Sequence, residues 1–295
     1  MKRVFCILIA ILLLVSVLSG CTAAQGDSPS AATDVISTAA SETNPQDGGL
    51  HIYCFAAGKA DAFLLYTDSS AVLIDTGESG FGKTIVEKCE ELGIDRLDCL
   101  IVTHFDKDHV GGAKKVLAEL SVTTVLQSNV PKDSSEYEKY VRQLAICGIE
   151  PITVRGDYRL TLGGVTYTVN APQQEHYADS ASNNSSLITS VEYGAKRFLF
   201  LGDAEDARLA ELIAASPAHY DLVKLPHHGN QHKPLPDLIR MTTPRYAIIT
   251  SSDDQPEDAR TVTLLNEAGA ETFLTRIAPV EIYTDGEQIT AQYEE

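Results

Sequence analysis

Tryptophan is absent from this sequence, methionine occurs twice, and aromatic residues make up only 7% of its 295 positions. Basic side chains are also scarce, because 23 lysines and arginines stand against 41 aspartates and glutamates. The resulting formal charge of -18 repels phosphate backbones and anionic lipid at long range. Tight non-specific binding to nucleic acid is therefore not expected unless metal ions supply the missing positive charge.

Two common catalytic motifs are missing as well. No glycine-rich phosphate loop follows a strand at the required spacing, and no Gly-x-Ser-x-Gly elbow occurs. Nucleotide kinases and serine hydrolases are therefore poorly supported.

The six cysteines form no Cys-x-x-Cys pair. Four of them follow the amino-terminal segment and stand alone in apolar or helical contexts, namely Cys54, Cys89, Cys99 and Cys147. The pattern favours buried free thiols, although an exported protein could pair two of them, and the sequence leaves both states open.

The first 21 residues have the plan of a secretory signal, with Lys2 and Arg3 before an apolar stretch at 4–18. The end of this segment, Leu-Ser-Gly-Cys at 18–21, resembles the lipobox of bacterial lipoproteins. That resemblance implies cleavage before Cys21 and a lipid on it, so the chain would be extracytoplasmic and anchored to the cell membrane. A plain secreted protein or a retained anchor helix is the alternative.

Residues 22–49 are rich in Ala, Ser, Thr, Gly and Pro and read as a flexible tether. The pattern changes at residue 50, where short β-rich runs alternate with turn residues and then with amphipathic helical runs. Residues 50–295 are thus predicted to be one folded domain. This order of elements favours an α+β fold, an αββα sandwich of two mixed sheets with helices outside, over a purely parallel sheet.

Polar, metal-capable side chains interrupt this domain where apolar strands end. His104 and its neighbours follow the run at 97–103, Asp203 follows 197–202, and two histidines follow 221–226. Sites gather at the carboxyl ends of strands because loops converge there on a rigid core. Carboxylate and imidazole groups are ligands for Zn, Mn or Fe, so a metal centre is predicted.

The stretch 103–112, THFDKDHVGG, contains His-x-Asp-x-Asp-His. This motif resembles the His-x-His-x-Asp-His signature of the metallo-β-lactamase superfamily, with Asp106 in place of the second histidine. That variant is similar to the ComEC-like branch of DNA-uptake competence proteins, as are NNSSLIT at 183–189 and LVKLPHHGN at 222–230. The resemblance covers residues 50–288.

The resemblance implies a pair of divalent metal ions, Zn or Mn. It assigns His104 and Asp106 to the first ion, and it places Asp203 between the two ions. Many members carry a further histidine where this chain has NNSSL. Asn184 or water would fill that place, so occupancy of the first position is open.

The second ion would be held by Asp108 and His109 together with a histidine of LPHHG. His228 aligns better with the family's ligand, and His227 is either its hydrogen-bonded neighbour or a ligand in its place. Asp108 is expected to be essential for catalysis. Asp75 follows a strand in LIDTG and is assigned a supporting role.

Two further side chains are candidates near the centre. His232 could donate a proton to the leaving group, although a surface histidine is an equal alternative. Lys107 could contact a substrate phosphate or simply be solvated. Gly111 and Gly112 are expected to let the following helix pack close to the metal loop.

Two adjacent cations lower the pKa of a bound water and clamp attacking and leaving oxygens, which suits phosphodiester hydrolysis. The sequence therefore predicts an exported, lipid-anchored metallohydrolase, a phosphodiesterase or nuclease whose substrate is a phosphodiester or another small anion, DNA included. One alternative is an esterase acting on phosphorylated cell-wall polymers. Another is a non-catalytic metal-binding lipoprotein. β-Lactam hydrolysis is less well supported because of Asp106 and the missing histidine.

Overall fold

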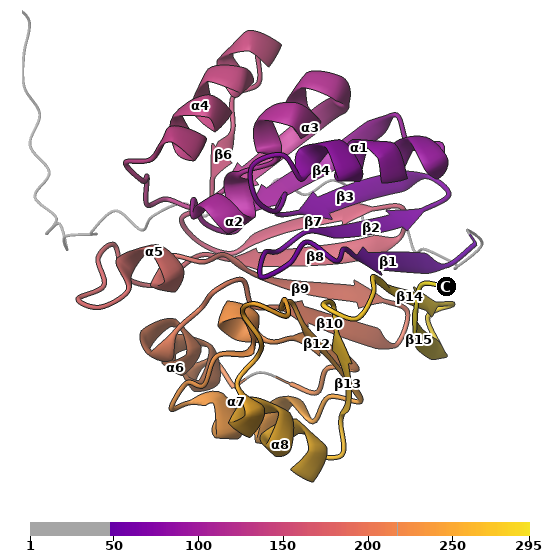
Figure 1. The fold of residues 1–295 in the computed structure, drawn as a ribbon, viewed down its shortest axis with the longest axis vertical. Coiled ribbons are helices and arrows are strands. Elements are labelled where there is room, and N and C mark those ends of the chain that lie inside the picture. The colour runs from indigo at the N-terminus through magenta and orange to yellow at the C-terminus, as the bar shows by residue number, and fades with distance from the viewer. Residues whose placement is uncertain (1–47, 217) are drawn as a thin grey trace, which may run out of the picture. The chain divides into compact units, whose positions relative to one another are not determined.

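In the computed structural model, which describes residues 48–216 and 218–295, the β-rich runs form two sheets that pack face to face (Figure 1). Helices cover the outer face of each sheet, which gives four layers in the order helix, sheet, sheet, helix. The predicted αββα sandwich is confirmed. The predicted signal segment, Cys21 and most of the tether lie outside the described residues.

The first sheet has eight strands in the order β15-β14-β1-β2-β3-β4-β5-β6. Strands β3, β4, β5 and β6 run parallel to one another, whereas the other pairs, β2–β3 included, are antiparallel, so the sheet is mixed. Its strands are β1 (Leu50–Cys54), β2 (Phe63–Thr67), β3 (Ser70–Ile74), β4 (Arg96–Val102), β5 (Ser121–Gln127), β6 (Ile152–Thr153), β14 (Val280–Thr284) and β15 (Ile289–Tyr293).

The second sheet has seven strands in the order β13-β12-β11-β10-β9-β8-β7 and is also mixed. Strands β7 and β8 form a hairpin, in which Gly163 and Gly164, both with positive φ, make the turn. The strands of the second sheet are β7 (Tyr158–Leu162), β8 (Val165–Asn170), β9 (Ile188–Tyr193), β10 (Lys196–Phe200), β11 (Leu222–Lys224), β12 (Tyr246–Ile249) and β13 (Glu271–Leu274).

The helices divide between the two outer layers (Figure 1). On the first sheet lie α1 (Gly82–Glu91), α3 (Ala113–Glu119) and α4 (Ser135–Cys147), and on the second α6 (Asp206–Ala214), α7 (Leu235–Thr242) and α8 (Ala259–Glu267). Three short helical turns lie in the connections: α2 (Lys107–Val110) between β4 and α3, α5 (Ala181–Asn184) between β8 and β9, and η1 (Pro226–Gly229) between β11 and α7.

The main core fills the space between the sheets. Strand β8 shows how the sequence builds it, because Val165, Tyr167 and Val169 are buried and alternate with half-buried threonine and asparagine. Across the interface the rings of Phe63 and Phe200 lie 5.2 Å apart. Two further apolar clusters attach the helices to the outer sheet faces, and the loops are thereby held on a rigid frame.

All four cysteines in the described residues are free, with Cys54, Cys89 and Cys99 buried and Cys147 exposed. Among the helices of residues 48–216 and 218–295, none is long and apolar enough to cross a membrane.

Candidate metal centre

Strand β4 delivers His104 to the edge of the sandwich. The imidazole is fully buried, and its Nδ1 lies 3.1 Å from the hydroxyl of Thr103 and 3.4 Å from that of Ser186. These contacts hold the ring through Nδ1 and leave Nε2 without a hydrogen-bond partner among the described residues. Burial lowers the pKa of His104 to about 4, so the ring is neutral at physiological pH and offers a lone pair.

His109 is held by Asp75, the residue to which a supporting role was assigned. Asp75 Oδ2 lies 2.8 Å from His109 Nδ1, and the same carboxylate accepts hydrogen bonds from the backbone N–H and the hydroxyl of Thr103 at 2.8 and 2.7 Å. Asp75 itself has a φ of 55°, a left-handed conformation that turns its side chain back into the core after β3. A carboxylate on Nδ1 orients the imidazole and raises the basicity of Nε2.

His228 is held in the same manner. Its Nδ1 lies 2.9 Å from the hydroxyl of Thr250 and 3.4 Å from Asp61 Oδ1. Its Nε2 lies 3.3 Å from a carboxylate oxygen of both Asp108 and Asp203. The ring is 1% exposed, so the loop after β11 buries it at the same point that the β4 loop reaches.

Four side chains from three loops thus share one small space. Ligand atoms of Asp108, His109, Asp203 and His228 all lie within 4.8 Å of one another. Nδ1 of each histidine is occupied, whereas Nε2 of His104, His109 and His228 and Oδ1 of Asp203 are buried with no partner of hydrogen-bond geometry among the described residues. Burying polar atoms without partners is costly, so this donor set fits a divalent cation.

The electrostatics agree with this interpretation. Burial alone would lower the pKa of His228, but Asp203, Asp108 and Asp61 raise it to about 10. Burial raises the pKa of Asp203, and the neighbouring His228 and His109 outweigh this effect and hold it well below its usual value. The Asp203 carboxylate is therefore ionised at neutral pH and attracts positive charge.

Asp106 lies beside His104, as the resemblance implies, with Asp106 Oδ1 3.8 Å from His104 Nε2. The same oxygen accepts hydrogen bonds from Lys132 Nζ, at 2.5 Å, and from the hydroxyl of Ser182. The side chains of Asp106 and Asp108 are 25% and 22% exposed, so the centre opens to solvent on their side.

His227 is not part of the four-ligand group and has other partners. Its Nδ1 lies 3.3 Å from Glu205 Oε1, and its ring stacks on His232 with centroids 5.5 Å apart. His232 Nδ1 in turn lies 3.4 Å from Asp206 Oδ1. Both histidines therefore border the centre, and His228 alone of the LPHHG pair joins the four-ligand group.

Asn184 is buried, but its side chain has other partners. Its Oδ1 accepts hydrogen bonds from the backbone N–H of Glu205 and of Arg208, and its Nδ2 donates to the carbonyl of Asp179. The Asn184 amide therefore accepts hydrogen bonds from the first backbone N–H groups of α6 and ties α5 to that helix. Lys107, the other candidate, is 71% exposed and lies 3.4 Å from Glu78.

The glycine pair after the motif has the predicted role. A Cβ on Gly112 would collide with the carbonyl oxygen of Thr76, and one on Gly111 with that of Lys107. Only glycine lets the loop that carries the motif at 103–112, the loop after β3 and the start of α3 come this close.

Sequence reasoning missed the ion pair beneath the centre. Lys224 is fully buried in β11 and donates hydrogen bonds to Asp61 and to the carbonyl of Gly202. Its Nζ lies 3.9 Å from Asp203. A lysine inside the apolar run LVKLP was the available signal, because a buried charge needs a partner.

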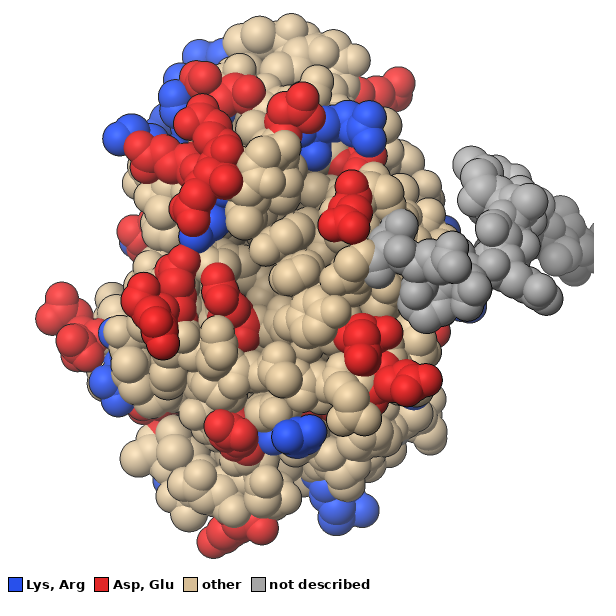
Figure 2. Space-filling view, turned by 90° about the vertical axis from the view of Figure 1, so that its right-hand side faces the viewer, with Lys and Arg blue, Asp and Glu red and all other residues tan. Residues whose placement is uncertain are grey.

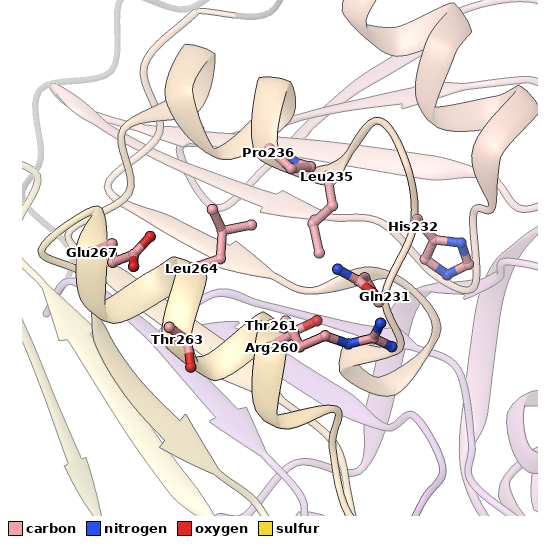
Figure 3. A pocket seen from close by; sticks show the side chains of 9 residues that line it. All are labelled: Gln231, His232, Leu235, Pro236, Arg260, Thr261, Thr263, Leu264 and Glu267. Atoms are coloured by element: carbon pink, nitrogen blue, oxygen red, sulfur yellow. The ribbon is translucent and has the colours of Figure 1, made fainter.

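A cavity of about 270 Å³ lies next to the centre, between α7 and α8 (Figure 3). Leu235 and Leu264 face it from opposite sides, whereas the ring of His232 is turned away from them. None of the four grouped ligands lines this cavity, so it is separate from the metal centre.

The family follows from this fold and geometry together with a family comparison. The model of the metallo-β-lactamase superfamily matches residues 56–251, which include every candidate ligand described above. The chain belongs to this superfamily.

Curated relatives of this chain include Competence protein ComA of Neisseria gonorrhoeae, to which it is 24% identical over 198 residues, covering 66% of this chain and 26% of that protein. The chain is 29% identical over 174 residues to ComE operon protein 3 of Bacillus subtilis, covering 57% of this chain and 22% of that protein. It is 25% identical over 204 residues to Recombination protein 2 of Haemophilus influenzae, covering 68% and 24%. The predicted likeness to ComEC-like proteins is confirmed, and the chain spans about a quarter of the length of the relatives it matches.

Solved structures support the fold. The metallo-β-lactamase fold protein YhfI from Bacillus subtilis superposes with a TM-score of 0.51 at 14% identity, covering 76% of this chain and 96% of that one. A variant of the β-hydroxylase CmlA gives a TM-score of 0.52 at 14% identity, covering 82% and 55%. A shared fold does not by itself fix the reaction.

Proposed function

We propose that this protein is a metal-dependent hydrolase of phosphodiesters that uses two divalent ions, Zn or Mn. The observation that carries the proposal is the convergence of buried, unpartnered ligand atoms from His109, Asp203 and His228 at a point that Asp108 opens to solvent. A purely structural metal site is closed, whereas a catalytic one keeps a side open for substrate.

When bound, a pair of divalent ions supplies a hydroxide near neutral pH and neutralises the oxygens of a phosphodiester. The protein's own residues do the rest. Asp75 and Thr250 fix the two imidazoles through Nδ1, so that Nε2 of each faces the same point. His232, assigned as proton donor to the leaving group, is oriented by Asp206 at the rim.

An anionic substrate agrees with the charge of the chain only if metal is present. Acidic side chains gather over much of the face in Figure 2, with lysine and arginine in smaller groups. Such a surface repels phosphate at long range, and the ions at the centre would provide the local attraction. We therefore expect metal-free protein to bind phosphodiesters poorly.

The relatives favour nucleic acid as the source of the phosphodiester. Two of them, Competence protein ComA and Recombination protein 2, are named for competence and recombination, which are processes that involve DNA. The proposal for this chain is accordingly a nuclease or phosphodiesterase that acts on DNA or its fragments, with a role related to competence.

We also infer that the chain is exported and held at the cell membrane by lipid on Cys21, on the strength of the lipobox-like sequence at 18–21. Fractionation of cells that express the protein tests this point. The wild type is expected in the membrane fraction and Cys21→Ala outside it, and an unchanged distribution would contradict the inference.

A hydrolysis screen tests the activity. The purified chain with Zn or Mn is offered bis-p-nitrophenyl phosphate, single-stranded DNA and a cephalosporin. Turnover of the first two substrates is expected, with little on the third, and Asp108→Ala should abolish it. Turnover that survives Asp108→Ala would refute the assignment, and bound metal without any turnover would favour a binding lipoprotein.

A further inference from the structure

Asp106 is already engaged on the oxygen that faces His104. Its Oδ1 lies 3.8 Å from His104 Nε2, and the same atom accepts hydrogen bonds from Lys132 and Ser182. The Lys132 contact joins an ammonium group to a carboxylate, so it is a charge-assisted hydrogen bond. A carboxylate oxygen with two donors has little capacity left for a cation.

The two donors come from segments that the fold places at this edge. Lys132 lies between β5 and α4, and Ser182 lies in α5. The segments are tied together, because the hydroxyl of Ser128 donates to the carbonyl of Ser185 at 2.8 Å. Lys132 is 36% exposed, so its ammonium group has room to leave Asp106 towards solvent.

The other metal position has no such competitor. Asp108, His109, Asp203 and His228 bring four ligand atoms together, and the described residues place no lysine or arginine on Asp108. Lys224 lies 3.9 Å from Asp203 but makes its hydrogen bonds to Asp61 and Gly202. The two positions are therefore unequal before any ion binds.

Charge balance points in the same direction. The centre contains five carboxylates, namely Asp61, Asp75, Asp106, Asp108 and Asp203. Before a hydroxide is bound, two divalent ions and the buried Lys224 already match these five charges. Lys132 adds one positive charge more, and it repels a second ion for as long as it stays on Asp106.

We propose that Lys132 blocks the first metal position, the one at His104 and Asp106, and we call this effect the lock. The ion at the other position, held by Asp108, His109, Asp203 and His228, binds tightly and is the earlier of the two to bind. The ion at His104 and Asp106 binds more weakly, because it must displace the Lys132 ammonium. This inference rests on the metal centre of the proposed function and adds Lys132 as the residue that sets the affinity of one position.

Titration of the metal-free full chain with Zn, and separately with Mn, tests the lock by calorimetry. The wild type is expected to bind the first equivalent tightly and the second weakly. Lys132→Met should tighten the second equivalent by about tenfold or more, the size of effect that groups contacting metal ligands commonly have. Lys132→Arg keeps the charge and should retain the weak second step.

Lys107→Met is the matched control. It removes the same charge from the neighbouring position in the motif, but Lys107 is 71% exposed and pairs with Glu78. The second equivalent of metal should therefore bind to Lys107→Met as it binds to the wild type. Thermal unfolding of each metal-free variant verifies that the fold is intact.

Two equivalents of equal affinity in the wild type, or an unchanged second step in Lys132→Met, would overturn the inference. An equal tightening in Lys107→Met would reduce it to a general charge effect and overturn it as well. The readout is metal binding, so a failure of phosphodiester turnover alone would count against the proposed function and leave the lock standing.

Discussion

Asp75 Oδ2 lies 2.8 Å from His109 Nδ1 in the buried floor of the centre, and this contact fixes which ring nitrogen of His109 faces outward. The carboxylate requires a proton on Nδ1. Nε2 is then the nitrogen that faces a cation; it lies 3.2 Å from Asp203 Oδ1, and because Asp203 and Asp75 hold the pKa of His109 well above its usual value, a metal ion must displace the proton there.

Asp75→Asn tests this relationship. Asparagine tolerates the left-handed backbone at this position, but its amide can donate to Nδ1 and so favours the tautomer with the proton on Nε2. We expect metal affinity to fall by about 10- to 100-fold while the fold is retained. Competition with a chelating dye measures this affinity, and a variant that binds as tightly as the wild type would refute the role given to Asp75.

The adjacent histidines of LPHHG should behave differently. His228→Ala removes the Nε2 that lies 3.3 Å from both Asp108 and Asp203, so tight metal binding should be lost. His227→Ala disturbs only the contacts with Glu205 and His232, and its metal affinity should stay near the wild-type value. Metal analysis after dialysis distinguishes the two variants, and the reverse result would make His227 the ligand.

The buried pair of Lys224 and Asp61 should dominate the stability of this region. Lys224→Met leaves the Asp61 carboxylate buried without its cation, which costs about 3–5 kcal/mol for such pairs. Urea unfolding of the metal-free chain measures the free energy of unfolding. Lys83→Met, at a lysine that is 72% exposed, is the control and should cost below about 1 kcal/mol.

A second variant checks the reason for that loss. If the unpaired carboxylate causes it, adding Asp61→Asn to Lys224→Met should recover part of the stability. A double variant that is as unstable as the sum of the two single changes would contradict the pairing.

Metal binding should release protons. The pKa of His228 is raised from 6.5 to about 10 in the metal-free fold. Protonation of His228 therefore stabilises the metal-free fold fully below pH 6.5, and this stabilisation is lost as pH rises through 10. A metal ion must displace that proton. Apparent affinity should therefore increase as pH rises from 6.5 towards 10. Calorimetry in two buffers of different ionisation enthalpy measures the release, and equal heats in both would contradict the expectation.

Much of the fold could be predicted from residue patterns. The alternation in 165–170 and the glycine pair at 163–164 specify a hairpin, and the continuous apolar run before His104 specifies a buried strand. Loops that end such strands meet at one edge, which is why the motif, Asp203 and His228 could be expected together. The family resemblance supplied their individual assignments, and these roles stay predictions until metal binding is measured.

The remaining residues depend on tertiary contacts that no local pattern contains. Asp61 and Lys224 are 163 positions apart and meet only because β11 passes beneath the loop before β2. Lys132 reaches Asp106 from a loop with no regular structure of its own. Asn184 was a candidate for the first ion, and the structure shows its amide occupied at the start of α6.

Metal content at saturation tests the centre most directly. The purified chain is loaded with Zn or Mn, freed of unbound ions, and analysed by mass spectrometry together with Asp203→Asn, which lacks the carboxylate that faces both His109 and His228. We expect about one or more ions to remain on each wild-type chain, the tightly held one at Asp108, His109, Asp203 and His228, and clearly less metal on the variant. A wild-type chain that retains no divalent ion would contradict the account.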